Sequence, residues 1–186
     1  MIELELEPQQ RLPGLAVGEF CLNLNFLRLG SWQEWRLVAA ELDELLAVQP
    51  EPATAEVAKW LGVPEGAAVL ARRRLMLVDE EPYQLGDSYY PHDLVADTPI
   101  AVAEPVEEGV LAVLERVHGQ PISYFIDELS FRMPTPDEAS ILRLDPGVSV
   151  VRVVRIAYDR DDKPLEAFDQ LLAGDKHVLV YEVSAE

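Results

Sequence analysis

The stretch Thr54–Val69, "TAEVAKWLGVPEGAAV", has a second, diverged copy at Thr135–Val150, "TPDEASILRLDPGVSV". The two copies align at a constant offset of 81 positions, and threonine, alanine, leucine and glycine recur at matched places. A unit of this size that occurs only twice indicates pseudo-twofold symmetry inside one domain, because solenoid folds need three or more copies. The matched residue types are those of helix caps, core positions and turns, so the repeat predicts the scaffold and not the function.

Each copy predicts a helix followed by a β-hairpin. In the first copy Thr54 is the expected N-cap of the helix, and alternating strands follow at 67–78 and 83–91. In the second copy Pro136 falls at the first helical position, where a missing N–H is tolerated, and strands follow at 148–158 and 165–174. The strand that opens the hairpin reads "ARRRL" in one copy and "RVVRI" in the other, and this difference suggests where a site lies.

The remaining segments add a helix at 106–119 and strands at 121–133 and 177–184. Upstream, residues 2–7 alternate like a strand and residues 20–30 are apolar. A capping box at Ser31 and Glu34 predicts a helix that continues to Leu46, although a strand over 44–49 fits the same short apolar run. The expected fold is α+β, a mostly antiparallel sheet with flanking helices. Residues 1–50 are expected to form an N-terminal arm and residues 51–186 the main domain.

The composition restricts the class of partner. The chain has 34 acidic residues against 15 lysines and arginines, for a net charge of −19, so direct nucleic-acid binding is not expected. No apolar run is long enough for a transmembrane helix, and Cys21 is the single cysteine, so a cytoplasmic location and no membrane partner are expected. With only three scattered histidines (His92, His118 and His177), no metal site and no cofactor are expected.

Two longer segments resemble a known family. Met133–Gly174, "MPTPDEASILRLDPGVSVVRVVRIAYDRDDKPLEAFDQLLAG", and Leu61–Leu94, "LGVPEGAAVLARRRLMLVDEEPYQLGDSYYPHDL", are similar to the two halves of the UTRA domain. This is the effector-binding domain of HutC-type GntR transcription regulators. The resemblance implies a chorismate lyase-like fold with an internal repeat, a pocket for a small-molecule effector, and dimerisation through the domain.

The resemblance also indicates which residues contact the effector. On the first hairpin strand the family's R-x-R motif falls on Arg72 and Arg74, which share one face of a strand while Arg73 points the opposite way. Two such guanidinium groups can clamp a carboxylate or a phosphate. The other positions that the resemblance assigns to the site lie on the returning strand, on the strand before the second copy and near the end of the chain: Asp87, Ser88, Tyr89, Glu128, Ser130, Arg132, Glu166, Asp169 and His177.

The chain departs from the family pattern at three places. Gly86 stands where the family often has glutamate, and Glu80 or Glu81 stands where it has a turn glycine. Residues 1–50 contain no sequence like the family's winged helix-turn-helix. The expected function is therefore that of a stand-alone domain that binds an anionic or polar metabolite in a sensing or regulatory role. Its expected partners are a second copy of the chain or a full-length regulator.

Two other functions remain open. One is a cofactor-independent lyase or cyclase, because chorismate lyase shows that the fold can host catalysis. Its acid–base groups would come from Asp87, Glu128, Glu166 and Asp169. No phosphate loop, dinucleotide-binding fingerprint or nucleophile elbow is present, and Cys21 has no histidine or acid at a spacing typical of a thiol nucleophile. The other is an interaction module whose arm, residues 1–50, binds a partner.

Overall fold

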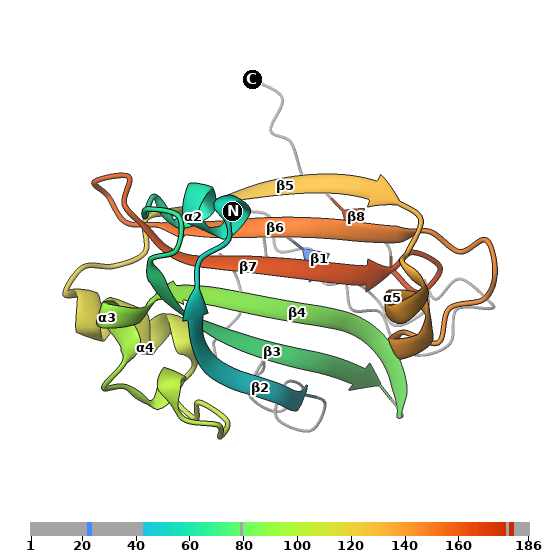
Figure 1. Cartoon of the computed structure of the whole chain (residues 1–186), viewed down its shortest axis with the longest axis horizontal. Helices are drawn as coiled ribbons and strands as arrows, with labels where there is room; N and C mark the ends of the chain where they lie inside the picture. The colour runs from blue at the N-terminus through green and yellow to red at the C-terminus, as the bar shows by residue number, and fades with distance from the viewer. Residues whose placement is uncertain (1–21, 24–42, 79, 178, 181–186) are drawn as a thin grey trace, which may run out of the picture.

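Six antiparallel strands form one sheet in the order β2-β3-β4-β7-β6-β5 (Figure 1). The structure is a computed structural model, and it describes residues 22–23, 43–78, 80–177 and 179–180. The strands are β2 (Asp43–Pro52), β3 (Ala68–Val78), β4 (Glu81–Pro91), β5 (Tyr124–Arg132), β6 (Val150–Tyr158) and β7 (Pro164–Ala173). The α+β class and the mostly antiparallel sheet are confirmed.

The strand order reproduces the repeat. Read from either edge, the sheet contains an edge strand, the first strand of a hairpin and the second strand of that hairpin. The two returning strands, β4 and β7, pair at the centre, where Asp87 is opposite Asp169. The halves therefore meet along the β4–β7 seam.

Both repeat helices begin as the sequence predicts. Helix α2 (Ala55–Leu61) follows Thr54, whose side chain accepts a hydrogen bond from the backbone N–H of Val57. Helix α5 (Pro136–Ile141) follows Thr135, and Thr135 and Glu138 form a capping box. The other helices are α3 (His92–Val95), the 3-10 helix η2 (Pro99–Ala101) and α4 (Val110–His118). The predicted helix at 106–119 corresponds to α4, whereas α3 and η2 were not predicted.

The expected helix from Ser31 to Leu46 is wrong over its last residues. Residues from Asp43 onward belong to β2, which pairs with β3 along its length, and the alternative strand over 44–49 is confirmed. A short apolar run fits the periodicity of a helix as well as that of a strand, and pairing with a long neighbouring strand decides between the two. Strand β2 crosses the expected division between residues 50 and 51. The rest of the predicted helix lies outside the described residues.

Little of the terminal segments is described. Two short parallel strands pair there, β1 (Leu22–Asn23) and β8 (Leu179–Val180). The predicted strand at 2–7, most of the segment at 20–30 and Cys21 lie outside the described residues. Of the predicted strand at 177–184, the structure describes β8 and the preceding His177.

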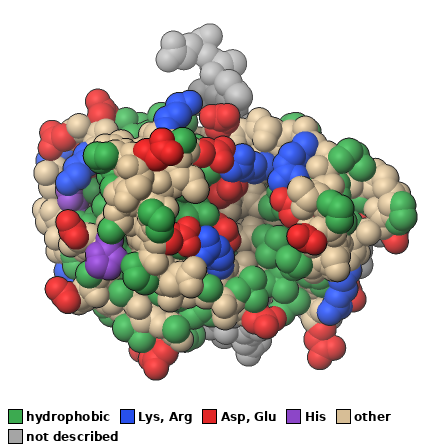
Figure 2. All heavy atoms as spheres, viewed as in Figure 1, with side chains coloured by type: hydrophobic (Ala, Val, Ile, Leu, Met, Phe, Trp, Pro, Cys, Tyr) green, Lys and Arg blue, Asp and Glu red, His purple; other side chains and the backbone are tan. Residues whose placement is uncertain are grey.

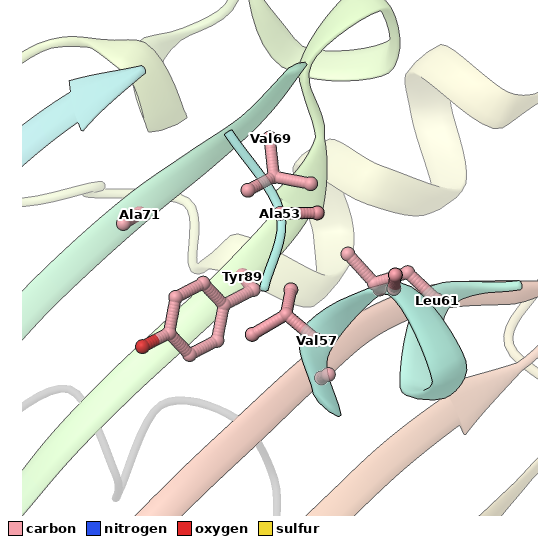
Figure 3. Packing of buried hydrophobic residues seen from close by; sticks show 8 residues of the cluster. Ala53, Val57, Leu61, Val69, Ala71 and Tyr89 are labelled. Atoms are coloured by element: carbon pink, nitrogen blue, oxygen red, sulfur yellow. The ribbon is translucent and has the colours of Figure 1, made fainter. Parts of the chain in front are cut away.

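Side chains alternate between the two faces of the sheet along each strand, and different elements cover the two faces. On the α2 face, Val69 and Tyr89 pack with Val57 and Leu61 of helix α2 (Figure 3). The same face carries a second apolar cluster beneath α5, which includes Leu142, Val150 and Leu171.

The opposite face, here the α4 face, is covered at one end by helices and at the other by the C-terminal segment. Leu70 and Tyr90 pack with Ile100, Val113 and Leu114 of η2 and α4. Further along, residues of β6 and β7 (Val151, Val153 and Leu172) pack with Leu179. The strand residues between these two clusters are largely polar.

Candidate ligand-binding site

The strand register places Arg72 and Arg74 on the α4 face and Arg73 on the α2 face. Arg72 is opposite Ser88 and Arg74 is opposite Gly86, both on β4. The predicted sharing of a face by the two arginines follows from strand alternation. Their surroundings differ.

Arg72 holds the segment that covers this face. Its guanidinium donates hydrogen bonds to the carbonyl oxygens of Ile100 at 2.9 Å, Val102 at 2.8 Å and Glu104 at 2.6 Å. The residue is 4% exposed. The loop after η2 is therefore fixed to the sheet by one side chain that satisfies three backbone acceptors.

Arg74 lies over an aromatic ring. Its guanidinium carbon is 5.0 Å from the ring centroid of Phe168 on β7, within the range of a cation–π contact. A Cβ atom at Gly86 would lie 2.7 Å from Cε2 of Phe168. The absence of a side chain at position 86 therefore makes room for the ring that supports Arg74.

A buried carboxyl group lies near these residues. Glu166 of β7 is 9% exposed and accepts a 2.7 Å hydrogen bond from the hydroxyl of Tyr90. Burial raises the pKa of Glu166 above its ordinary value, while the Tyr90 hydrogen bond, the charge of Arg74 and the Ser88 hydroxyl lower that pKa. Burial next to this carboxylate also raises the pKa of Tyr90.

Two glutamines complete the polar part of the α4 face, and sequence reasoning missed both. Nε2 of Gln84 donates a 3.2 Å hydrogen bond to Oε1 of Gln170, and both residues are buried. Within the described part of the chain, Nε2 of Gln170 has no hydrogen-bond partner. Strand alternation is the signal that could have found Gln170, because it places this residue on the face of Glu166 and Phe168.

The expected site residues are divided between the two faces of the sheet. The structure brings Arg72, Arg74, Ser88 and Glu166 together on the α4 face. The α2 face carries Asp87, Tyr89, Asp169, Glu128, Ser130 and Arg132.

His177 lies beyond the end of β7, where its Nδ1 is 2.8 Å from the carbonyl oxygen of Ala173 and its ring contacts that of Tyr83 edge-on. Burial lowers the pKa of His177. Of the other histidines, His118 is largely buried, with Nε2 2.7 Å from a carboxylate oxygen of Asp159.

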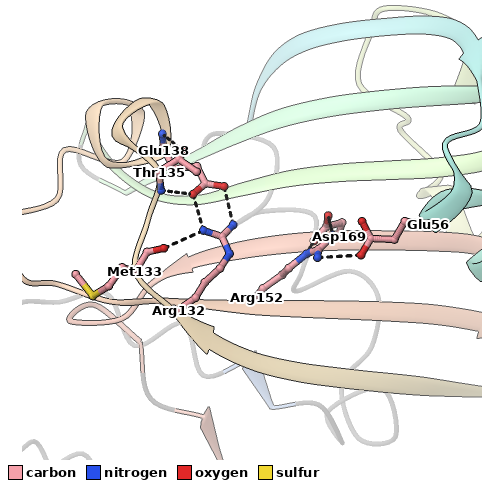
Figure 4. A network of polar contacts seen from close by, with 7 residues as sticks. All are labelled: Glu56, Arg132, Met133, Thr135, Glu138, Arg152 and Asp169. Carbon is pink, nitrogen blue, oxygen red and sulfur yellow. Dashed lines mark hydrogen bonds and ion pairs between the residues drawn. The ribbon is translucent and has the colours of Figure 1, made fainter.

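On the α2 face the charged residues form ion pairs. Arg152 of β6 bridges Asp169, with two contacts of 2.8 Å, and Glu56 of α2 at 3.0 Å (Figure 4). Arg132 makes two 2.7 Å contacts with Glu138. Figure 2 shows acidic and basic side chains around a hollow near the middle of this face. The contacts of Arg152 and Arg132 join α2 and α5 to the sheet.

Asp87 and Tyr89 belong to the same cluster. Burial raises the pKa of Asp87, and the nearby Arg73, 3.3 Å away, opposes that shift. Burial and the Asp87 charge raise the pKa of Tyr89 to about 12.

Among the residues that the structure describes, no group of three or more histidine, cysteine or acidic side chains is arranged to hold a metal ion. In the same part of the chain, no helix is long and apolar enough to cross a membrane.

The fold is that of solved bacterial transcription regulators of the GntR family. The ligand-binding domain of a GntR-family regulator from Bordetella bronchiseptica has the same fold, with a TM-score of 0.63 over 76% of this chain and 89% of that one, at 21% identity. PhnF from Mycobacterium smegmatis is 26% identical, with a TM-score of 0.66 over 86% of this chain and 71% of that one.

The family model of the UTRA domain matches residues 43–178, and the chain belongs to that family. The HTH-type transcriptional regulator SCO4628 of Streptomyces coelicolor is 33% identical over 70% of this chain and 49% of that protein. GgaR of Escherichia coli is 27% identical over 68% of this chain and 49% of that protein. The chain thus spans about half the length of these curated relatives. The predicted family is confirmed.

Proposed function

We propose that this protein binds a small polar or anionic metabolite on the α4 face, in a sensing or regulatory role. The proposed site lies between the apolar cluster beneath η2 and α4 and the apolar cluster that includes Leu179. The site residues are Arg74, Ser88, Glu166 and Gln170, with Arg72 holding the covering loop. Membership in a family of regulator domains supports a binding role over catalysis. The observation that carries the site is the buried amide nitrogen of Gln170, which has no partner among the described residues.

The chemical basis is the cost of an unsatisfied buried donor. Such a group destabilises a fold by about 1–3 kcal/mol, so a ligand oxygen at Gln170 recovers that free energy on binding. Binding that holds the covering loop against the sheet would favour one conformation, which is how an effector acts on a regulator. In this proposal the partners are a second copy of the chain or a full-length regulator, as expected from the family, and the location is the cytoplasm.

A metabolite thermal-shift screen tests this function. We expect at least one small polar metabolite to raise the melting temperature of the wild type and to have a smaller effect on an Arg74→Met variant. Arg132→Met, on the opposite face, is the matched control and keeps the wild-type response. Equal responses in the wild type and the Arg74→Met variant would place the ligand elsewhere.

A second candidate function is a cofactor-independent lyase or cyclase on the same face. The feature that favours it is Glu166, a buried carboxyl group with a raised pKa beside a tyrosine hydroxyl, which suits general acid–base chemistry. Mass spectrometry of each metabolite that binds separates the two functions. A new product that is lost in Glu166→Gln supports the enzyme, and unchanged ligand supports the sensor.

A further inference from the structure

Strand β5 forms one edge of the sheet, and its side chains are unusually apolar for an exposed strand (Figure 1). Within the part of the chain that the structure describes, its only strand neighbour is β6. Ile126 is 50% exposed and Phe131 is 70% exposed, and the exposed large apolar residues of this segment also include Tyr124 and Met133. An edge strand of this kind presents unpaired backbone groups that a further strand can use. The β5 edge therefore has the features of an interaction surface.

The other edge strand, β2, is protected against such pairing. Its Pro50 and Pro52 have no backbone N–H to donate, and its register with β3 shifts between Leu45 and Ala47. Strand β5 contains no proline, glycine or lysine, and it pairs with β6 residue for residue along its whole length. The two edges thus differ in the features that prevent strands from adding to a sheet, and β5 lacks them.

A second copy of the chain matches the β5 edge. In a twofold antiparallel pair, each contact occurs twice, so the pairing is centred on one residue that lies opposite its own copy. When the centre is the middle residue, Glu128, all nine residues of β5 pair with the copy. Phe125 then lies opposite Phe131 of the partner subunit, on the α4 face, and Tyr124 lies opposite Arg132 of the partner subunit, on the α2 face.

The one unfavourable contact in this register lies at its centre. Glu128 would lie opposite Glu128 of the partner subunit, and like charges directly opposite each other destabilise a strand pair. The residue is exposed, so water and salt weaken this repulsion. Two pairs of Phe125 and Phe131 offset it, because aromatic pairs contribute more than an exposed charge pair and because they cover the exposed ring of Phe131.

Other registers fit less well. Centring on Leu129 would place Asp127 opposite Phe131 of the partner subunit, and Ile126 opposite Arg132 of the partner subunit. Each of these contacts would occur twice and would set an apolar side chain against a charged one. Every centre other than the middle residue also pairs fewer residues of the strand.

We propose that the protein forms a twofold dimer through β5, with the Glu128 residues of the two subunits opposite each other. The two six-stranded sheets then join into one, and the α4 faces of both subunits lie on the same side of it. This inference goes beyond the proposed function because it assigns the surface that a second copy contacts. It uses no residue of the proposed ligand site, so its tests involve no ligand.

Sedimentation equilibrium of the full chain tests the surface. We expect a monomer–dimer equilibrium that Phe131→Asp weakens at least about tenfold. Because Phe131 is largely exposed, this change should leave the folding of each subunit intact. Leu46→Asp, at an exposed apolar residue of the β2 edge, is the matched control and should change the dissociation constant less than about twofold. A protein that is monomeric at all concentrations overturns the proposal, and so does a dimer that Leu46→Asp weakens more than Phe131→Asp.

The central glutamate gives a variant that should strengthen the dimer. Glu128→Gln removes the like-charge contact, and we expect it to lower the dissociation constant about threefold. Glu65→Gln removes the same charge from an exposed turn and should have a smaller effect. Equal effects of the two variants would show that net charge alone controls the association, and that result overturns the register.

Disulfide cross-linking tests the register directly. In a Cys21→Ser background, which lacks the single native cysteine, Glu128→Cys places two thiols on Cα atoms about 4.5–5.5 Å apart, within the range of a disulfide. Ser130→Cys is the control, because its two copies are displaced by four residues, or about 14 Å, along the strands. We expect cross-linked dimer from Glu128→Cys alone. Faster cross-linking of Ser130→Cys overturns the proposal and leaves the proposed ligand binding, which the metabolite screen tests, unaffected.

Discussion

Tyr90 and Glu166, 76 positions apart in the chain, share a 2.7 Å hydrogen bond inside the α4 face. They lie on β4 and β7, the corresponding strands of the two repeat halves and neighbours at the centre of the sheet. The first half contributes Arg74 and Ser88 to the same face, and the second contributes Glu166 and Gln170. The candidate site therefore lies on the seam of the repeat, where neither half is sufficient alone.

The Glu166 carboxyl group should lower stability at neutral pH. Burial raises its folded-state pKa above the ordinary value of 4.5, so its favourable contribution is full below pH 4.5 and is lost as the pH rises through the folded-state pKa. We expect Glu166→Gln to be more stable than the wild type at pH 8, with a difference that shrinks as the pH falls towards 4.5. Urea unfolding at several pH values measures this. A difference that is independent of pH would contradict the assignment.

Removing the Tyr90 hydroxyl should have the opposite effect on stability. Tyr90→Phe keeps the packing of a fully buried ring but leaves Oε1 of Glu166 without its hydrogen bond. The expected loss is about 1–3 kcal/mol in the free energy of unfolding at pH 8. In a Glu166→Gln background the loss should be smaller, because the buried acceptor is then uncharged. A double-mutant cycle measures this coupling, and additive effects would show that the two side chains act independently.

Arg72 should act through the covering loop. Arg72→Met leaves the carbonyls of Ile100, Val102 and Glu104 without their donor, and we expect a loss of about 2–4 kcal/mol. The loss should be accompanied by faster amide hydrogen exchange in residues 99–105. Arg73→Met, whose partners Glu51 and Asp87 lie at the more exposed α2 face, is the control and should cost less. Unchanged exchange in the loop would contradict this role.

The scaffold could be predicted because its signals are local. Thr54 and Thr135 cap their helices, and alternation places Arg72 and Arg74 on one face. The prediction of a helix that reaches Leu46 is wrong because its short apolar run fits the periodicity of a helix and that of a strand. Pairing with β3 decides in favour of the strand. The division of the site also follows from alternation, since the consecutive residues Asp87, Ser88 and Tyr89 cannot all share one face of a strand.

The partners of each site residue could not be predicted. Arg72 finds its acceptors 28 to 32 positions along the chain, in a loop whose path the sequence does not specify. Gln84 and Gln170 are 86 positions apart, and only the β4–β7 pairing brings them together. Whether an arginine binds a ligand or holds a loop is a property of tertiary contacts.

Position 86 should tolerate no side chain. In Gly86→Ala the new Cβ would lie 2.7 Å from Cε2 of Phe168, so the ring must move away from its place beneath Arg74. We expect a loss of about 1–3 kcal/mol from overpacking, together with weaker ligand binding. Phe168→Leu in the Gly86→Ala background should recover part of the stability but not the binding, because the smaller side chain removes the clash and also the ring. Thermal unfolding and calorimetry of the single and double variants test both parts, and an unchanged Gly86→Ala protein would contradict the packing.

The ion pair with Arg132 should set the pKa of the Glu138 carboxyl group, in the first turn of α5. Hydrogen bonds from Arg132, supported by the backbone N–H of Thr135, lower the pKa of Glu138 to about 2. Because this pKa is depressed, the stabilisation is present above the ordinary value of 4.5 and is lost as the pH falls towards 2. Both side chains are partly exposed, so Arg132→Met should cost only about 1 kcal/mol at pH 7. The same change should move the titration midpoint of the Glu138 carboxyl group, followed by the chemical shift of its carboxyl carbon, most of the way back towards 4.5.

Thr135→Ala is the control for the ion pair. It removes the cap hydroxyl but keeps Arg132, so it should lower stability by about 1 kcal/mol while the titration midpoint of Glu138 moves much less. A Glu138 titration midpoint near 4.5 in the wild type would show that the pair does not form in solution.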